Sequence, residues 1–178
     1  MKLHNVSIIV TCQEQQTQLR QLLPQLFSLQ YEGEFEVIVV DKMHDKDFAG
    51  WLEEMESRHP NLCHTFCPAT ARGINVHRLA LTLGAKASAY EWLVILSADV
   101  VFPGDDWLSR FTACCGDEVD AVIGTTSRKH RWHRLTFNIF RHRFAIFNAT
   151  SSIILCRRSI LLQADNTIPK KRIIYLPV

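Results

Sequence analysis

Short apolar runs alternate with amphipathic segments along the first part of the chain. The runs are rich in aliphatic and β-branched residues and end in polar or turn-forming residues, as strands buried on both faces do; they cover residues 6–10, 35–40, 61–67 and 93–96. Between the runs, apolar side chains recur at helical spacing over residues 16–29, 45–58 and 71–87. The pattern therefore predicts the order β-α-β-α-β-α-β.

Two of the expected helices contain residues with a particular structural meaning. Pro24 lies inside the first helical pattern, where a proline can kink a helix. In the third helix Gly84 permits a close approach to the sheet. The side chains expected to face the sheet from that helix are Leu79, Ala80, Leu83 and Ala87.

This alternation implies crossover connections and a mainly parallel sheet with helices on both faces, which is a three-layer α/β fold. Beyond Pro103 the pattern predicts a short helix over residues 105–115 and strands over residues 119–124, 151–156 and 172–176. A chain of 178 residues is long enough to bury a core without disulfides or metals. We expect one domain over residues 1–178.

The composition is that of an ordinary soluble globular protein, with 47% apolar and 21% charged residues. The first apolar run is too short for a secretory signal and has no small-residue cleavage site, so we expect a cytosolic chain. In that compartment the six cysteines are expected to be reduced and mostly packed. Cys63, His64 and Cys67 resemble half a zinc site, but no second pair follows at zinc-finger spacing.

Charge is distributed unevenly along the chain. Residues 1–120 hold 9 Lys/Arg against 17 Asp/Glu, a balance of −8, and residues 121–178 hold 11 against 1, a balance of +10. Such asymmetry indicates an anionic partner for the C-terminal third.

Residues 128–147 mix arginines with bulky apolar side chains at roughly helical spacing. One interpretation is a helix lying on an anionic membrane surface, and another is an amphipathic helix that covers the sheet. Nucleic acid is a third candidate for the anionic partner. The sequence contains no known nucleic-acid-binding motif, so we expect no nucleic-acid partner. The aromatic residues concerned are Trp132, Phe137, Phe140, Phe144 and Phe147.

Polar residues follow three of the predicted strands. Thr11 follows the first strand, Asp41 the second, and Asp99 follows the fourth just before the chain-breaking Pro103-Gly104. The carboxyl ends of parallel strands meet at one edge of an open sheet, where ligands bind. Each acid has a structural alternative as a turn cap, but together they predict a nucleotide site with a metal on Asp99.

Arg72 and the amino end of the third helix are expected to complete a cradle for phosphate, because a guanidinium and free helical N–H groups both favour anions. The competing motifs are missing from the sequence. The chain has no Gly-x-Gly-x-x-Gly, no P-loop, no Gly-x-Ser-x-Gly and no His-Glu-x-x-His. These absences argue against a dinucleotide-binding enzyme, a P-loop ATPase, a serine hydrolase of the α/β type and a zinc protease.

Four segments, in order and correctly separated, resemble the family 2 glycosyltransferases with the GT-A fold. Residues 6–11 resemble the family's opening strand, and residues 35–41 its second strand with the uridine-binding aspartate. Residues 69–72 with 79–87 are similar to its alanine-rich third helix, and residues 90–99 to the strand that carries Asp-x-Asp. The resemblance covers about residues 6–115 and implies a GT-A (Rossmann-like) sheet.

The resemblance implies roles for individual residues. The nucleotide-sugar contacts would come from Thr11, Glu14, Asp41, Arg72 and Ala98, and Asp99 would reach a Mg²⁺ or Mn²⁺ ion that bridges the diphosphate. The reaction implied is transfer of a sugar from a nucleoside-diphospho-sugar, with uridine as the expected nucleoside, to a glycan or lipid-linked acceptor. Peripheral contact with the inner face of a membrane through residues 128–147 fits the same picture.

Two departures from the family pattern affect the expected activity. Ser97 stands where Asp-x-Asp has its first acid, which leaves one carboxylate. Asp165 is the only carboxylate after Asp120, so it is a weak candidate for the catalytic base in an incomplete acceptor half over residues 116–178. The alternative function is a non-catalytic GT-A subunit that binds a nucleotide or a membrane surface.

Overall fold

The structure, a computed structural model, describes residues 4–43, 45–68, 75–102, 104–125, 143–145, 153–163, 167–169 and 172–177. The strands are β1 (Val6–Cys12), β2 (Phe35–Asp41), β3 (Leu62–Phe66), β4 (Trp92–Ser97), β5 (Ala121–Thr125), β6 (Arg143–Ala145), β7 (Ile153–Arg157), β8 (Thr167–Pro169) and β9 (Ile173–Pro177). The helices are α1 (Gln16–Phe27), α2 (Lys46–Arg58), α3 (Val76–Ala87), α4 (Trp107–Thr112) and α6 (Arg158–Leu162).

Seven of the strands form one sheet in the order β3-β2-β1-β4-β7-β5-β9. β3, β2, β1 and β4 run parallel, β7 runs antiparallel to both β4 and β5, and β9 is parallel to β5. The expected α/β fold with a mainly parallel sheet is confirmed. β6 and β8 form a separate antiparallel pair.

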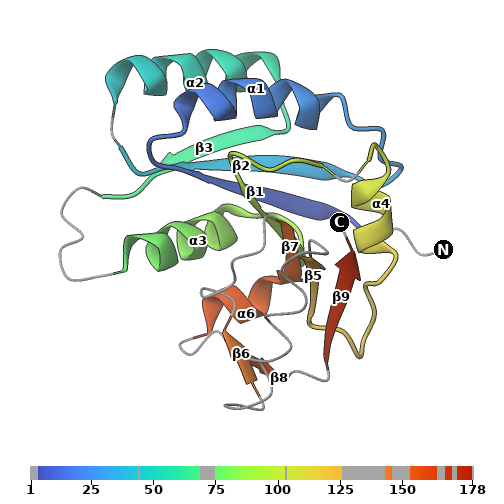
Figure 1. Cartoon of the computed structure of the whole chain (residues 1–178). Coiled ribbons are helices and arrows are strands. Elements are labelled where there is room, and N and C mark those ends of the chain that lie inside the picture. The colour runs from blue at the N-terminus through green and yellow to red at the C-terminus, as the bar shows by residue number, and fades with distance from the viewer. Residues whose placement is uncertain are drawn as a thin grey trace.

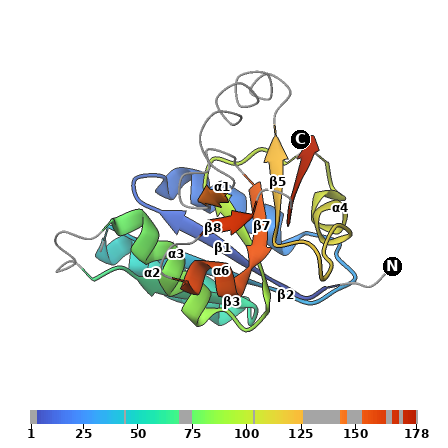
Figure 2. The same cartoon turned by 90° about the horizontal axis from the view of Figure 1, so that it is seen from below.

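Helices cover both faces of the sheet (Figure 1). α1, α2 and α4 pack against one face and bury side chains such as Leu19, Phe48 and Trp107 in one apolar cluster. α3 and α6 pack against the other face, which Figure 2 shows from their side. Strand residues alternate between the two clusters, so that Ile8 belongs to the first and Ile9 to the second. Burial on both faces explains why the strands appear in the sequence as continuous apolar runs.

The first half of the chain agrees closely with the elements expected from the pattern. β1 and β2 extend past the predicted ends to Cys12 and Asp41, so Thr11 lies inside β1 and does not follow it. α1 continues through Pro24, which is exposed. On the solvent side, water can satisfy the carbonyl that the missing proline N–H leaves without a helical partner.

α3 begins later and presents a slightly different face than expected. It starts at Val76, and the side chain of Asn75 caps it by accepting from the Arg78 backbone N–H at 3.0 Å. Ala80, Leu81, Gly84 and Ala85 are its buried residues, and Leu79 and Leu83 pack beside them. Ala87 is exposed, so its predicted contact with the sheet is wrong. It is the last residue of the helix, where the chain turns towards β4.

The C-terminal third differs more from expectation. The strands expected over residues 119–124, 151–156 and 172–176 correspond to β5, β7 and β9, but β6, β8 and α6 were not predicted. The helix expected over residues 128–147 is wrong at Arg143–Ala145, which pairs with β8 as a strand. Periodicity alone cannot separate helix from strand in short apolar runs, and only pairing with a distant segment decides the outcome here. The expected helix over residues 105–115 shortens to α4.

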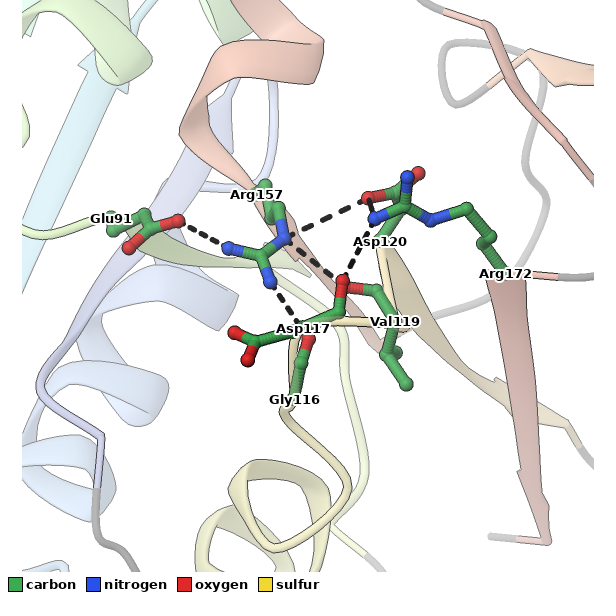
Figure 3. A network of polar contacts seen from close by, with 7 residues as sticks. All are labelled: Glu91, Gly116, Asp117, Val119, Asp120, Arg157 and Arg172. Carbon is green, nitrogen blue, oxygen red and sulfur yellow. Dashed lines mark hydrogen bonds and ion pairs between the residues drawn. The ribbon is translucent and has the colours of Figure 1, made fainter.

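A network of hydrogen bonds and ion pairs centred on Arg157 joins the amino end of β4 to the neighbouring strands (Figure 3). The Arg157 guanidinium donates to Glu91, to the Val119 carbonyl at 3.1 Å and to the Gly116 carbonyl at 2.7 Å. The Asp120 carboxylate lies 3.7 Å from Arg157 Nε and 2.8 Å from Arg172 Nη2. These contacts join β4, β7, β5 and β9 at one end of the sheet.

In the part of the chain that the structure describes, no helix is long and apolar enough to cross a membrane.

Candidate functional site

The carboxyl ends of β1, β2 and β4 lie side by side in register. Thr11 of β1 is paired with Val40 of β2 and with Ser97 of β4, and Cys12 is paired with Asp41. Parallel strands lie about 4.8 Å apart, so these residues span about 10 Å of one edge. The predicted gathering of the strand-end residues is therefore observed for Thr11, Asp41 and the segment that leads to Asp99.

Asp41 is a nearly buried carboxylate at this edge, with 3% of the residue exposed. Its Oδ1 accepts a hydrogen bond from the backbone N–H of Met43 at 2.9 Å. The backbone of β2 is also hydrogen-bonded to its neighbours at this point. The Asp41 carbonyl accepts from the Cys67 N–H at 2.8 Å, and the Lys42 N–H donates to the Cys12 carbonyl at 3.0 Å. Asp41 thus has a fixed position between the ends of β1 and β3.

Burial and the Asp41 charge both raise the pKa values of the neighbouring thiols, Cys12 and Cys67. Burial raises the pKa of the Cys12 thiol to about 11, and the Asp41 carboxylate raises it further. Burial also raises the pKa of Cys67, while the Lys42 ammonium opposes the shift. Burial lowers the pKa of His77 in the first turn of α3, and Lys42 contributes to this shift. Lys42 therefore places a positive charge near the strand ends and the start of α3.

Ser97 and Asp99 form a local hydrogen-bonded pair after β4. The Ser97 hydroxyl donates to Asp99 Oδ1, and the Val100 N–H donates to the Ser97 carbonyl at 3.1 Å, which closes a turn. Asp99 is exposed, whereas Ala98 between the two residues is 3% exposed. The turn directs the acid into solvent at the end of the strand.

These residues fit a hydrated divalent cation better than a cation enclosed by protein. Among the described residues no group of three or more His, Cys, Asp or Glu side chains is placed to hold a metal ion. Mg²⁺ and Mn²⁺ bind through one or two carboxylates together with phosphate oxygens and water. The exposed Asp99 carboxylate satisfies that requirement when a diphosphate supplies the other ligands.

The other predicted site residues divide into two groups. Thr11 is partly exposed at the end of β1, and Glu14 is exposed in the turn that follows. Arg72 and Asp165 lie outside the described residues, as does all of 128–147 except Arg143–Ala145. Their roles in phosphate binding, catalysis and membrane contact stay predictions, and so do the cytosolic location and the division into two halves at residue 115.

The sequence reasoning missed an apolar component of this edge. Phe66, the last residue of β3, is 59% exposed, and Met43, two residues after Asp41, is 44% exposed. The available signal was the alternation of Leu62, His64 and Phe66, which places the phenylalanine on the same face as Leu62. An apolar residue at the exposed end of an edge strand is a candidate for ligand contact.

Solved structures with the same fold include several enzymes that act on nucleotide-linked sugars. The mannosyltransferase PcManGT from Pyrobaculum calidifontis, solved with GDP-Man and Mn²⁺, superposes with a TM-score of 0.71 at 18% identity, covering 99% of this chain and 56% of that one. S. aureus TarS 1-349 with UDP-GlcNAc gives 0.62 at 17% identity, covering 97% and 56%.

A third structure, glucosyl-3-phosphoglycerate synthase from Mycobacterium tuberculosis with Mn²⁺, UDP and phosphoglyceric acid, gives a TM-score of 0.63 at 12% identity, covering 98% of this chain and 68% of that one. At these identities the likeness establishes the GT-A fold. The chain spans little more than half the length of the first two proteins.

A comparison with curated protein sequences gives no match. At the level of families, residues 4–167 match the description "Glycosyltransferase like family 2". That match takes in every strand from β1 to β7 and therefore the whole edge that carries Thr11, Asp41 and Asp99. The chain belongs to the family 2-like glycosyltransferases.

Proposed function

We propose that the chain binds a nucleoside-diphospho-sugar across the carboxyl ends of β1, β2 and β4 and transfers the sugar to a glycan or lipid-linked acceptor. The observation that carries the proposal is the register of these strands, which pairs Cys12 with Asp41 and Thr11 with Ser97. Asp41, the hydrogen-bond acceptor for the base, and Asp99, the carboxylate on the phosphate side, thereby lie at the ends of the two strands that flank β1.

In this proposal Asp41 recognises the base and Thr11 hydrogen-bonds to the nucleotide. A fixed carboxylate accepts N–H donors, and uracil offers one at N3 while guanine offers two. Uridine is the proposed nucleoside. Because only 3% of Asp41 is exposed, neighbouring side chains have to give way for a base to reach it. Its hydrogen bond is then shielded from water, which strengthens it.

Asp99 is the proposed metal ligand on the diphosphate side. A bound Mg²⁺ or Mn²⁺ ion supplies Lewis-acid neutralisation of the leaving nucleoside diphosphate. The chain's own contribution is to hold the Asp99 carboxylate in solvent beside β4, with the Ser97 hydroxyl fixing one of its oxygens. Glu14, the Ala98 backbone and Arg72 are proposed to line the remainder of the donor site, and Asp165 is the proposed candidate base.

Calorimetry with UDP in the presence of Mn²⁺ tests the binding half of the proposal. We expect binding by the wild-type chain and its loss in Asp41→Ala. Glu53→Ala, which removes an exposed acid from the outer side of α2, is the matched control and should bind as the wild type does. Intact binding in Asp41→Ala would show that the base site has been misplaced.

A second candidate is a non-catalytic GT-A subunit that binds the nucleotide without turnover. The observation that favours it is Ser97, which leaves Asp99 as the single acid of the turn after β4. Release of UDP from UDP-sugars, followed with and without candidate acceptors, separates the two functions. Turnover that disappears in Asp99→Asn supports the enzyme, and nucleotide binding with no turnover supports the subunit.

A further inference from the structure

Exposed apolar side chains gather at the same edge of the sheet as Asp41. Within the described residues the exposed large hydrophobic residues are Met43, Phe66, Val76, Val101, Leu162 and Tyr175. The first four all follow or end a parallel strand at its carboxyl end: after β2, at the end of β3, at the start of α3 and after β4. Large apolar side chains are usually buried, so a concentration at one edge indicates a surface that a ligand covers.

Phe66 is the member of this set that lies closest in the sheet to Asp41. The two residues are paired in register on the neighbouring strands β2 and β3. Paired residues of parallel strands project on the same face of the sheet. Asp41 lies two residues after Val39, and Phe66 lies four residues after Leu62. Val39 and Leu62 both belong to the apolar cluster on the face that α1, α2 and α4 cover, so Asp41 and Phe66 project on that face. The phenyl ring and the carboxylate are therefore neighbours on one face.

Met43 extends this apolar surface along the edge. Its backbone N–H donates a hydrogen bond to Asp41 Oδ1 at 2.9 Å, and 44% of the residue is exposed. A methionine side chain is flexible and polarisable, so it can move aside and then pack against an aromatic ligand. Phe66 and Met43 therefore offer a flat aromatic face and an adaptable apolar contact near a fixed hydrogen-bond acceptor.

We propose that Phe66 is the platform on which the nucleobase stacks while its edge hydrogen-bonds to Asp41, with Met43 closing over the base. This inference rests on the proposed function and adds a residue that determines affinity for the base. An aromatic ring stacks on any base, so Phe66 supplies affinity and the Asp41 carboxylate supplies selection for bases with an N–H donor on that edge.

Titration of UDP and of inorganic pyrophosphate, each with Mn²⁺, tests the platform. Stacking on one aromatic side chain predicts that Phe66→Ala weakens UDP binding about 5- to 100-fold. Pyrophosphate has no base, so its affinity should not change. Phe66→Trp should retain UDP affinity, whereas Phe66→Leu should lose most of it because a leucine has no ring. Tyr175→Ala, on β9, removes another exposed aromatic side chain and is the control.

The outcomes separate this inference from the proposed function. If the wild-type chain does not bind UDP, the proposed function fails and the platform with it. If the wild type binds UDP and Phe66→Ala binds it equally well, only the platform is wrong. An equal loss of UDP and pyrophosphate in Phe66→Ala would also overturn it, because that result indicates a general distortion of the site.

Discussion

The Ser97 hydroxyl donates a hydrogen bond to the carboxylate of Asp99, two residues further along the chain. The family resemblance predicts an acid at the position of this serine, which instead donates a hydrogen bond to Asp99. The pair predicts the effect of restoring the missing charge. Ser97→Asp should raise the Mn²⁺ affinity of the UDP complex about tenfold, because the number of charged ligands tunes affinity for hard cations.

Ser97→Ala is the control for this substitution, since it removes the hydroxyl and adds no charge. It should not raise the Mn²⁺ affinity above that of the wild type, and the loss of the hydrogen bond to Asp99 can lower it. Titration of Mn²⁺ into the chain at saturating UDP measures both variants. An affinity that is the same in Ser97→Asp and Ser97→Ala would mean that the turn after β4 does not bind the metal.

The sequence predicted the parallel half of the fold because three of its four strands, β1, β2 and β4, are buried on both faces. Val6 to Val10, for example, is apolar at every position but Ser7, and β2 and β4 show the same composition. The strand ends followed from these runs to within two residues, and the position of Asp41 and Asp99 at one edge followed from the parallel order. Those conclusions depend only on local composition and on rules of connection.

What the sequence could not predict depends on contacts between distant segments. β7 lies between β4 and β5 because Leu93 to Leu96 pair with Ile153 to Cys156, a relationship that periodicity does not contain. The exposure of Phe66 is also invisible in the sequence, where it reads as one more apolar residue of a strand. β3 is an edge strand of the sheet, and 59% of its last residue is exposed.

Gly84 and Ile9 are in such close contact that the glycine tolerates no side chain. A Cβ at residue 84 would lie 2.7 Å from Ile9 Cγ2 and 3.1 Å from its Cδ1. Since Ile9 is fully buried in β1, Gly84→Ala forces α3 away from the sheet and should destabilise the fold by about 1–3 kcal/mol. Urea unfolding measures this loss.

Gly50, in α2, is the matched control because a Cβ there would meet nothing within 4 Å. Gly50→Ala should stabilise the chain by about 0.5–1 kcal/mol, the usual gain from replacing glycine inside a helix. Ile9→Ala removes Cγ1, Cγ2 and Cδ1, so the double variant Gly84→Ala/Ile9→Ala should lose less stability than the sum of the two single losses. A Gly84→Ala variant as stable as the wild type would show that α3 does not approach β1 so closely.

The thiols of Cys12 and Cys156 predict a loss of stability in alkaline solution. Burial raises the pKa of Cys12 to about 11 and that of Cys156 to about 12, against an ordinary value of 9.0. In the unfolded chain both thiols lose their protons near pH 9, while in the folded chain they keep them. The unfolded state therefore binds fewer protons above pH 9, and the free energy of unfolding should fall as the pH rises from 9 to 11.

Urea unfolding at pH 8, 9, 10 and 11 checks this dependence. Burial also raises the pKa of Cys115 to about 12, so at least three thiols contribute. Cys156→Ala removes one of them, so its stability should fall less steeply over the same range, whatever its stability at pH 8. An equal slope in the variant and the wild type would assign the alkaline loss to other groups, such as the tyrosines.

Arg157 lies at the centre of the contacts that fasten the C-terminal strands to the parallel half of the sheet (Figure 3). Its side chain is 18% exposed, stacks over the Trp92 ring with 4.6 Å between the guanidinium carbon and the ring centroid, and donates to two backbone carbonyls. Arg157→Met would keep much of the apolar contact with Trp92 and remove every polar one.

The substitution should destabilise the chain by about 2–4 kcal/mol, because it removes the hydrogen bonds to the partly buried Val119 and Gly116 carbonyls and leaves the 13%-exposed Asp120 with fewer cationic partners. Arg58→Met is the control: it breaks an exposed pair with Glu54 on α2, which should change stability by at most about 0.5 kcal/mol. Urea unfolding followed by tryptophan fluorescence measures both variants. If Arg157→Met and Arg58→Met are equally stable, the network around Arg157 does not hold β7 against β4. Apolar burial alone then accounts for the joining of the C-terminal strands to the parallel part of the sheet.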